Sequence, residues 1–374
     1  MSAIPARRLL SRVMSAEIVA PALRALGRGL VSIFTLHRFA DPDLGVVGLD
    51  PAALRDHLAY LRRHRYRLLS LTDVIRELDD GGGGGGGGGG APAVAFTVDD
   101  GYGGFARIAA PIFAEYDCPV TLFVTTGFLD GLLWFWWDRV THLFTHTQRS
   151  SLELDLESEQ RSYRWATPDE QSRARHDVIC RLEWLDGVER EATIAQLSRQ
   201  LDVELPASPP PAFAPITWEE VRRTANLGVT FGPHTVTHPI LSLATDEACR
   251  WEIEESYRRV RQETDAWVPV FCYPNGEPRA FGQRELEATQ RAGFGAALTT
   301  LWDYAAAPHR RPHGALSRFA LPRFPYPEDR SHLVHLVSGL MRLNWMIQGR
   351  RRIRRSGATP RLAALSATCA GLLA

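Results

Sequence analysis

Three short segments of the chain carry side chains suited to catalysis or metal binding. Asp99 and Asp100 are adjacent, His234 and His238 lie four residues apart, and a third segment reads Tyr273-Pro274-Asn275-Gly276. A carboxylate with two imidazoles is a typical ligand set for a catalytic metal ion, and a second carboxylate can transfer protons. Each segment alone also has an ordinary reading, because Asp-Gly and Pro-Asn-Gly form turns and paired histidines often have unrelated surface roles. Only the combination of the three segments therefore indicates a catalytic or metal-binding site.

An apolar run precedes each of these segments. Residues 93–98 lead to Asp99, residues 229–231 lead to His234 through a Gly-Pro pair, and residues 268–273 end on the Pro-Asn-Gly turn. Such runs are typical of buried strands. Enzymes with parallel sheets place their active sites at the carboxyl ends of the strands, so we expect the three segments to lie close together.

The wider chain alternates strand and helix patterns, which predicts a mostly parallel sheet, either a barrel or doubly wound. Strands are predicted at 30–36, 93–98, 120–124, 229–231, 268–273 and 296–300. Helices are predicted at 51–64, 71–79, 105–116, 221–227, 246–265 and 283–292.

The order of the motifs resembles the polysaccharide deacetylase family, also called the NodB homology or carbohydrate esterase 4 family. The resemblance rests on Thr97–Tyr102, His234–Pro239 and Tyr273–Gly276, and one branch is especially similar through Leu36–Phe39 and Leu321–Arg323. It covers roughly residues 31–326 and implies a distorted (β/α)7 barrel. It also implies a hydrolase that acts on carbon-nitrogen bonds and removes N-acetyl groups from a polysaccharide or oligosaccharide.

The resemblance implies a role for each motif residue. Asp100, His234 and His238 would hold a divalent metal, and Asp99 would be the general base. Zinc is the metal that we expect, and cobalt, nickel and manganese suit the same ligands.

The chain departs from many relatives at the general acid and at an arginine. The C-terminal histidine segment that supplies the acid elsewhere is missing, so His37 on the first strand is predicted as the acid and His335 is the alternative. Phe271 and Cys272 stand where many relatives have the arginine that orients the base, and Arg323 is predicted to replace it.

The resemblance places oxyanion and substrate contacts at Tyr273, Pro274 and Asn275, with a backbone N–H near Tyr273 as the oxyanion donor. The aromatic run Trp134–Trp137 could stack on a sugar, although large aromatic side chains more often belong to a core.

The amino-acid composition argues against several classes of function. The 374 residues carry 43 basic and 43 acidic side chains, so the formal net charge is zero and nucleic acid is not expected as a partner. The chain contains no lysine, which excludes Schiff-base and P-loop chemistry. Its five scattered cysteines predict neither a disulfide scaffold nor a thiolate zinc site.

The predicted organisation is one barrel with additions. An N-terminal helix (1–30) precedes the barrel (31–330), which contains a helical insertion (146–212) and a flexible loop of ten glycines (81–90), and a C-terminal helix and basic tail (331–374) follow. No export signal or membrane span is recognisable, so the chain is predicted to be cytoplasmic. The basic cluster Arg350–Arg355 would allow peripheral contact with anionic lipid at the inner face of the membrane.

The leading hypothesis is a glycan N-deacetylase in the biosynthesis of an exopolysaccharide or the cell envelope, with an acetylated glycan as substrate. An O-acetyl esterase on the same site and a catalytically silent carbohydrate-binding barrel are the alternatives. The presence of candidate ligands, base and acid weakens the second alternative.

Overall fold

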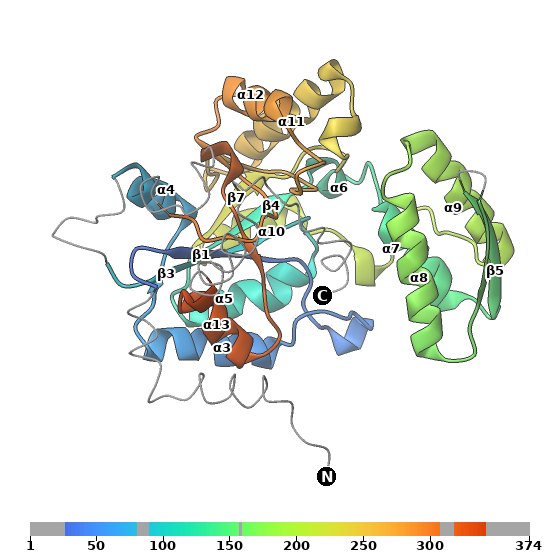
Figure 1. The fold of residues 1–374 in the computed structure, drawn as a ribbon, viewed down its shortest axis with the longest axis horizontal. Helices are drawn as coiled ribbons and strands as arrows, with labels where there is room; N and C mark the ends of the chain where they lie inside the picture. Colours follow the sequence, from blue (N-terminus) through green and yellow to red (C-terminus); the bar gives the residue numbers. More distant parts are fainter. Residues whose placement is uncertain (1–26, 81–89, 157–158, 307–317, 342–374) are drawn as a thin grey trace, which may run out of the picture. The chain divides into compact units, whose positions relative to one another are not determined.

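The computed structural model describes residues 27–80, 90–156, 159–306 and 318–341. The chain divides into two compact units, one made of Met1–Leu129 with Ile216–Ala374 and the other of Asp130–Pro215 (Figure 1). Residues 1–26 of the predicted N-terminal helix, residues 81–89 of the glycine loop and the Arg350–Arg355 cluster lie outside the described residues. Within the described ranges, no helix combines the length and apolarity that a membrane span requires.

Parallel strands form the centre of the first unit. The main sheet has the order β10-β1-β3-β4-β7, β2 pairs with the start of β3, and β8 pairs with β9 in a second sheet. The strands are β1 (Val31–Leu36), β2 (Arg67–Leu68), β3 (Ala93–Val98), β4 (Val120–Val124), β7 (Val229–Pro233), β8 (Val270–Cys272), β9 (Ala296–Leu298) and β10 (Phe324–Pro325). The predicted strands are confirmed, with ends that shift by up to two residues.

Two isolated bridges join these sheets into a ring. Phe231 in the middle of β7 pairs in parallel with Trp267 just before β8, and Leu298 of β9 pairs in parallel with Leu321 just before β10. Because β10 also pairs with β1, the order β1-β3-β4-β7-β8-β9-β10 closes on itself. The predicted distorted (β/α)7 barrel is therefore confirmed, with its weakest pairing at these two junctions.

Alternation along the strands separates the barrel interior from its outside. Val31 and Ile33 of β1 share one buried cluster with residues of β3, β8 and β9, whereas Phe34 and Leu36 pack in another cluster with the surrounding helices. This is the period of two expected for strands that are buried on both faces. Thr35 continues the interior row toward the carboxyl end of β1, where the candidate site lies.

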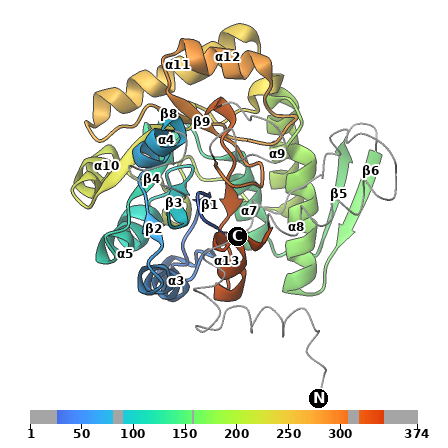
Figure 2. The ribbon, with the colours of Figure 1, turned by 60° about the vertical axis from the view of Figure 1, so that its left-hand side comes forward.

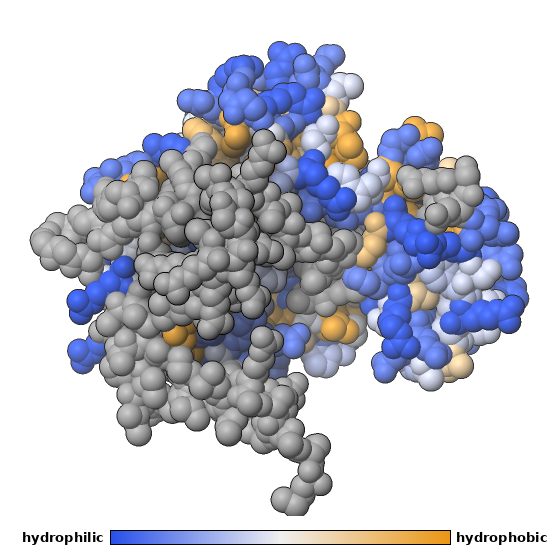
Figure 3. All heavy atoms as spheres, viewed as in Figure 1, coloured by the Kyte–Doolittle hydropathy of each residue, from blue (hydrophilic) through white to orange (hydrophobic). Residues whose placement is uncertain are grey.

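Helices surround the strands (Figure 2). Several begin at a side chain that accepts a backbone N–H of the first turn, among them α3 at Asp50, α4 at Ser70 and α11 at Thr245. Hydrophilic residues cover the outer sides of α11 and α12 (Figure 3). The helices of this unit are α3 (Pro51–Arg63), α4 (Leu71–Asp79), α5 (Ala110–Glu115) preceded by the π-helical turn η2 (Phe105–Ala109), α6 (Thr126–Leu129), α10 (Trp218–Ala225), α11 (Asp246–Glu263), α12 (Gln283–Arg291) and α13 (Arg330–Val337).

The second unit differs from the predicted all-helical insertion. It contains α7 (Trp136–His146), α8 (Pro168–Leu182) and α9 (Gly187–Leu201), and also an antiparallel hairpin of β5 (Ser151–Leu156) and β6 (Glu159–Arg164). In β5, Leu152 and Leu154 are buried while the residues between them are exposed, so the strand has a period of two. The high charge of this segment hid that alternation in the sequence.

Candidate active site

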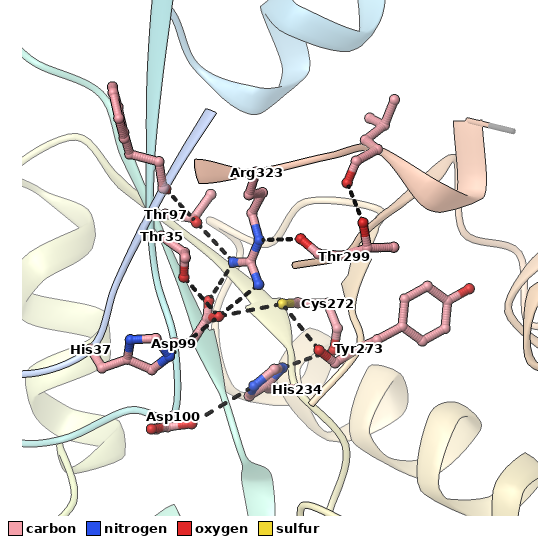
Figure 4. Close-up of polar contacts among 12 residues, drawn as sticks. Thr35, His37, Thr97, Asp99, Asp100, His234, Cys272, Tyr273, Thr299 and Arg323 are labelled. Atoms are coloured by element: carbon pink, nitrogen blue, oxygen red, sulfur yellow. Dashed lines mark hydrogen bonds and ion pairs between the residues drawn. The ribbon is translucent and has the colours of Figure 1, made fainter. Parts of the chain in front are cut away.

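Asp99 follows β3 directly, and side chains from three other segments surround its carboxylate (Figure 4). Arg323 donates from Nη1 to Oδ1 at 2.8 Å, and its Nη2 lies 2.8 Å from Oδ2. The Thr35 hydroxyl donates to Oδ2 at 3.0 Å, and the Cys272 thiol lies 3.7 Å from the same oxygen. We name Asp99, Thr35, Thr97, Cys272 and Arg323 the carboxylate pocket.

Arg323 is held in place before it meets Asp99. Its side chain is 0% exposed, Nε donates to the Thr299 carbonyl at 3.0 Å, and Nη1 also donates to the Thr97 hydroxyl at 2.9 Å. Such contacts fix the planar guanidinium so that both of its ends face one carboxylate. The predicted orientation of Asp99 by Arg323 thus has a direct geometric basis.

These neighbours decide the ionisation of Asp99. Burial alone would raise the pKa of this carboxyl group, but the charge of Arg323 and the proximity of His234 outweigh it and hold the pKa well below its usual range. Asp99 is therefore an ionised carboxylate throughout the neutral range.

The Asp100 side chain faces His234 and His238. Its φ of +74° departs from the strand and turns the backbone away from the direction of β3. Its Oδ1 lies 3.7 Å from Nε2 of His234 and 3.4 Å from Nε2 of His238. The side chains of the adjacent residues Asp99 and Asp100 therefore lie in two different environments.

The histidines follow β7 on a short loop, residues 234–238, which we name the histidine loop. Nδ1 of His234 lies 2.8 Å from the Cys272 carbonyl. Because a carbonyl oxygen only accepts, Nδ1 must carry the proton and Nε2 keeps its lone pair toward Asp100. Burial lowers the pKa of His234 to about 4, so this imidazole is neutral near pH 7.

Asp100, His234 and His238 fit a divalent metal. Their ligand atoms all lie within 4.8 Å of one another, and the three side chains are largely buried. Atoms that bind one tetrahedral zinc ion at about 2.0–2.1 Å are about 3.3 Å apart, close to the distances from Asp100. A carboxylate with neutral imidazoles is a hard and borderline donor set, which suits zinc and its first-row neighbours.

A second group of ligand-type atoms, Asp99 with His234 and Cys272, fits a metal less well. Asp99 is already paired with Arg323, whose positive charge opposes a cation beside it. Burial raises the pKa of the Cys272 thiol well above its usual value, so the thiolate that would bind a metal does not form near neutral pH.

His37 lies on the same side of the barrel, directly after β1. Its Nε2 is 4.0 Å from Oδ2 of Asp99, and its side chain is 32% exposed. His335 lies elsewhere, because α13 meets β1 at Ser32, whose hydroxyl donates to the Leu336 carbonyl. Ser32 and His37 are five residues apart on an extended strand, about 16 Å, so the geometry favours His37 over His335.

The third motif is held by strand pairing and by core packing. The Tyr273 N–H donates to the Leu298 carbonyl at 3.1 Å, and Pro274 has no N–H. The Tyr273 side chain is 1% exposed and stacks on Phe281 at 4.8 Å, so it belongs to the core. Backbone pairing with β9 therefore occupies the N–H of Tyr273 itself, and an oxyanion donor near Tyr273, with Pro274 and Asn275 as substrate contacts, stays a prediction.

A glycine holds this loop against β9. A Cβ atom on Gly276 would lie 2.3 Å from the Thr300 nitrogen, so any larger residue would separate the two segments. The Thr300 N–H donates to the Gly276 carbonyl at 3.0 Å. The Pro-Asn-Gly turn thus fixes the loop beside the backbone that also binds Arg323.

The aromatic run Trp134–Trp137 lies in the second unit, where its members divide by burial. Phe135 and Trp137 are buried and stack on each other with ring centroids 4.4 Å apart. Trp136 is half-buried beneath the Arg190 guanidinium, 5.0 Å from its ring centre. Half of the run is therefore core, and sugar contact stays a prediction for Trp134 and Trp136.

Sequence reasoning missed residues that have no motif of their own. Thr35 and Thr97 supply polar contacts inside the barrel, and Glu252 of α11 binds the histidine loop. Thr35 and Thr97 are register partners on β1 and β3, and hydroxyls inside otherwise apolar strands were the available signal. Glu252 offers a similar signal because it lies on the buried face of its helix.

The comparisons with known proteins agree with this geometry. Residues 182–297 match the family model of polysaccharide deacetylases, a range that includes the histidine loop and the third motif. A deacetylase of Streptococcus pyogenes, PplD, solved in complex with acetate, is similar with a TM-score of 0.50 and 16% identity over 84% of this chain and 98% of that one. This likeness shows the shared fold.

IcaB from Ammonifex degensii is also similar, with a TM-score of 0.49 and 15% identity over 84% of this chain and 98% of its own. No curated protein sequence matches the chain.

Proposed function

This chain belongs to the polysaccharide deacetylase family, and from that premise we propose that it is a metal-dependent glycan N-deacetylase with Asp99 as its general base. As a family member it is a hydrolase of carbon-nitrogen bonds. The observation that carries the finer proposal is the separation of its two carboxylates. Asp99 is paired with Arg323, while Asp100 faces two imidazole nitrogens whose distances suit one metal ion.

Asp100, His234 and His238 would hold the ion. When bound there, a divalent metal supplies Lewis acidity, which lowers the pKa of water and polarises the acetyl carbonyl. The low pKa of Asp99 makes this carboxylate a weak base, so its role requires a water that is unusually acidic.

The remaining steps belong to the side chains of the chain itself. As water attacks the acetyl carbon, Asp99 accepts a proton from it, and a carbon-oxygen bond forms. His37 then donates a proton to the sugar nitrogen as the carbon-nitrogen bond breaks, giving acetate and a free amine. The 4.0 Å between the Nε2 of His37 and the Oδ2 of Asp99 brings base and acid within reach of one amide group.

The substrate proposal is an N-acetylated glycan of the kind found in exopolysaccharides. Support comes from the family match and from the exposure of His37, which leaves the site accessible from outside the barrel. The identity of the metal is proposed to be zinc, since buried neutral imidazoles with one carboxylate match its preferred ligands.

The test combines metal content with acetate release from N-acetylated chito-oligomers. We expect the wild type to bind one divalent ion and to release acetate with free amines, His234→Ala to lose both properties, and Asp99→Asn to keep the metal but lose about 10²–10⁴-fold in turnover. Release of acetate with new hydroxyls would identify an O-acetyl esterase instead. A wild type that binds metal and glycan without releasing acetate would show a binding protein.

A further inference from the structure

The histidine loop has a strained backbone. Thr235 has a φ of +65° and His238 a φ of +59°, in the left-handed region that branched and bulky side chains disfavour. Residues in this conformation persist only where their surroundings hold them. The contacts outside the loop must therefore fix its conformation.

One side of the loop is held by the start of α6. The N–H groups of Thr126 and Gly127 donate to the carbonyls of Thr235 and Val236 at 3.0 and 2.9 Å. These bonds satisfy the carbonyls of Thr235 and Val236, so the N–H groups in the middle of the loop need acceptors from another element.

The other side is held by one carboxylate on α11. Oε2 of Glu252 accepts the N–H of Val236 at 2.7 Å and that of Thr237 at 2.9 Å. Oε1 of Glu252 accepts the Thr237 hydroxyl. The side chain of Glu252 thus binds the middle of the loop, between the two histidines.

The position of Glu252 in its helix is unusual for a charged residue. Cys249, Ile253, Ser256 and Val260 form the buried face of α11, and Glu252 lies on that face with 5% exposure. Burying a carboxylate is unfavourable unless hydrogen bonds compensate for the lost hydration. An apolar side chain would pack there without that penalty, so the acceptors toward the histidine loop account for a glutamate here.

From these contacts we propose that Glu252 is a positioning residue for metal binding, which holds the strained histidine loop so that His234 and His238 both face Asp100. The inference rests on the proposed metal site. It adds that Glu252, which lies on a helix outside the motifs and is not one of the three ligand residues, sets the metal affinity of that site. Partners that orient metal ligands typically change affinity about 10–100-fold when they are removed.

A merely structural role would make a different prediction. If Glu252 only stabilised the barrel, its loss would lower the free energy of unfolding without changing metal affinity in the protein that remains folded. Glu285 provides a matched control, because it is also buried, accepts the Gly282 N–H at 2.7 Å and pairs with Arg284 at the start of α12.

The experiment measures zinc affinity of the full chain by competition with a chromophoric chelator. We expect Glu252→Leu to bind zinc about 10–100-fold more weakly than the wild type. Glu252→Gln should keep most of the affinity, because its amide oxygen still accepts both N–H groups and its NH₂ can reach the Thr237 hydroxyl. Glu285→Leu should change the affinity by less than about twofold, since the hydrogen bonds given for the Glu285 carboxylate go to Gly282 and Arg284 and not to the histidine loop.

The measured zinc affinities distinguish a failure of this inference from a failure of the proposed function. Unchanged zinc affinity in Glu252→Leu, or an equal loss in Glu285→Leu, would overturn this inference and leave the proposed function in place. A wild type that binds neither zinc nor cobalt would overturn both. If Glu252→Leu does not fold, Thr237→Val replaces it, with Thr237→Ser as the control that keeps the hydroxyl. Equal affinity in those two variants would also overturn the inference.

Discussion

One peptide bond joins Asp99 in the carboxylate pocket to Asp100, which faces the histidine loop. These two regions are nevertheless built in opposite ways. Donors fill the carboxylate pocket, where Arg323 and Thr35 satisfy Asp99. At the histidine loop, Asp100 faces imidazole nitrogens, and that of His234 carries no proton.

This difference shows how one strand end can serve two functions. A carboxylate surrounded by donors is complete in the protein alone and stays ionised. A carboxylate that faces the lone pair of His234, with His238 beside it, fits a bound cation. The two pockets should therefore respond separately to mutation, and four predictions test that separation.

The largest effect is expected from Arg323→Leu. It leaves the buried Asp99 carboxylate without its ion pair and should lower the free energy of unfolding by about 3–5 kcal/mol. Urea denaturation of the metal-free protein measures this loss. A loss below 1 kcal/mol, within the range of an exposed ion pair, would show that the pocket does not depend on this arginine.

Arg323→Lys tests the geometry of the pocket rather than its charge. An ammonium group keeps the positive charge but cannot face both carboxylate oxygens and the Thr299 carbonyl together. We expect turnover to fall by about 100-fold, as for a misplaced catalytic group, with unchanged metal content. Unchanged turnover would remove Arg323 from the mechanism, and lost metal would show that the two pockets are coupled.

Thr35→Val removes one donor to Asp99 with almost no change in shape. A hydrogen bond to a charged group contributes at least about 1.5 kcal/mol, so we expect turnover to fall by about tenfold or more. Thr35→Ser keeps the hydroxyl and serves as the control. The comparison of kcat for the two variants at saturating metal decides whether the hydroxyl or the side-chain volume matters.

The smallest effect concerns His234 in the metal-free protein. Burial lowers its pKa to about 4, so the folded state resists protonation that the unfolded chain accepts below its ordinary pKa near 6.5. The stability contributed by neutral His234 should therefore be complete above about pH 6.5 and decline as the pH falls toward 4. NMR titration of labelled histidine should give a midpoint near 4, and a midpoint near 6.5 would contradict the buried, neutral imidazole.

Much of the fold was predictable because the apolar strands are unambiguous. The runs that became β1, β3 and β4 contain five or six buried residues each, and no helix pattern competes with them. The hairpin at 151–164 was missed because its buried leucines alternate with charged residues in a segment whose composition favours helix.

The site was predictable where residue type and spacing carry the chemistry, and less so where tertiary contacts do. Asp100 and His238 follow from motifs, and the structure brings them within 3.4 Å. The pairing of the Tyr273 N–H with the Leu298 carbonyl did not follow from the sequence, because it is a tertiary contact between two separate strands. Glu252 was missed because its partners lie 15 and 16 residues away, on the histidine loop.

The junction between β7 and β8 has a consequence for how the barrel opens. The two strands are linked by the single Phe231–Trp267 bridge, and the His234 imidazole adds a side-chain bond from the end of β7 to the Cys272 carbonyl at the end of β8. The His234 side chain thus links the barrel strands at one of the two junctions where backbone pairing is weakest. The rate of amide hydrogen exchange in β8 and β9 should rise in His234→Ala even without metal, because local unfolding would begin at the junction between β7 and β8.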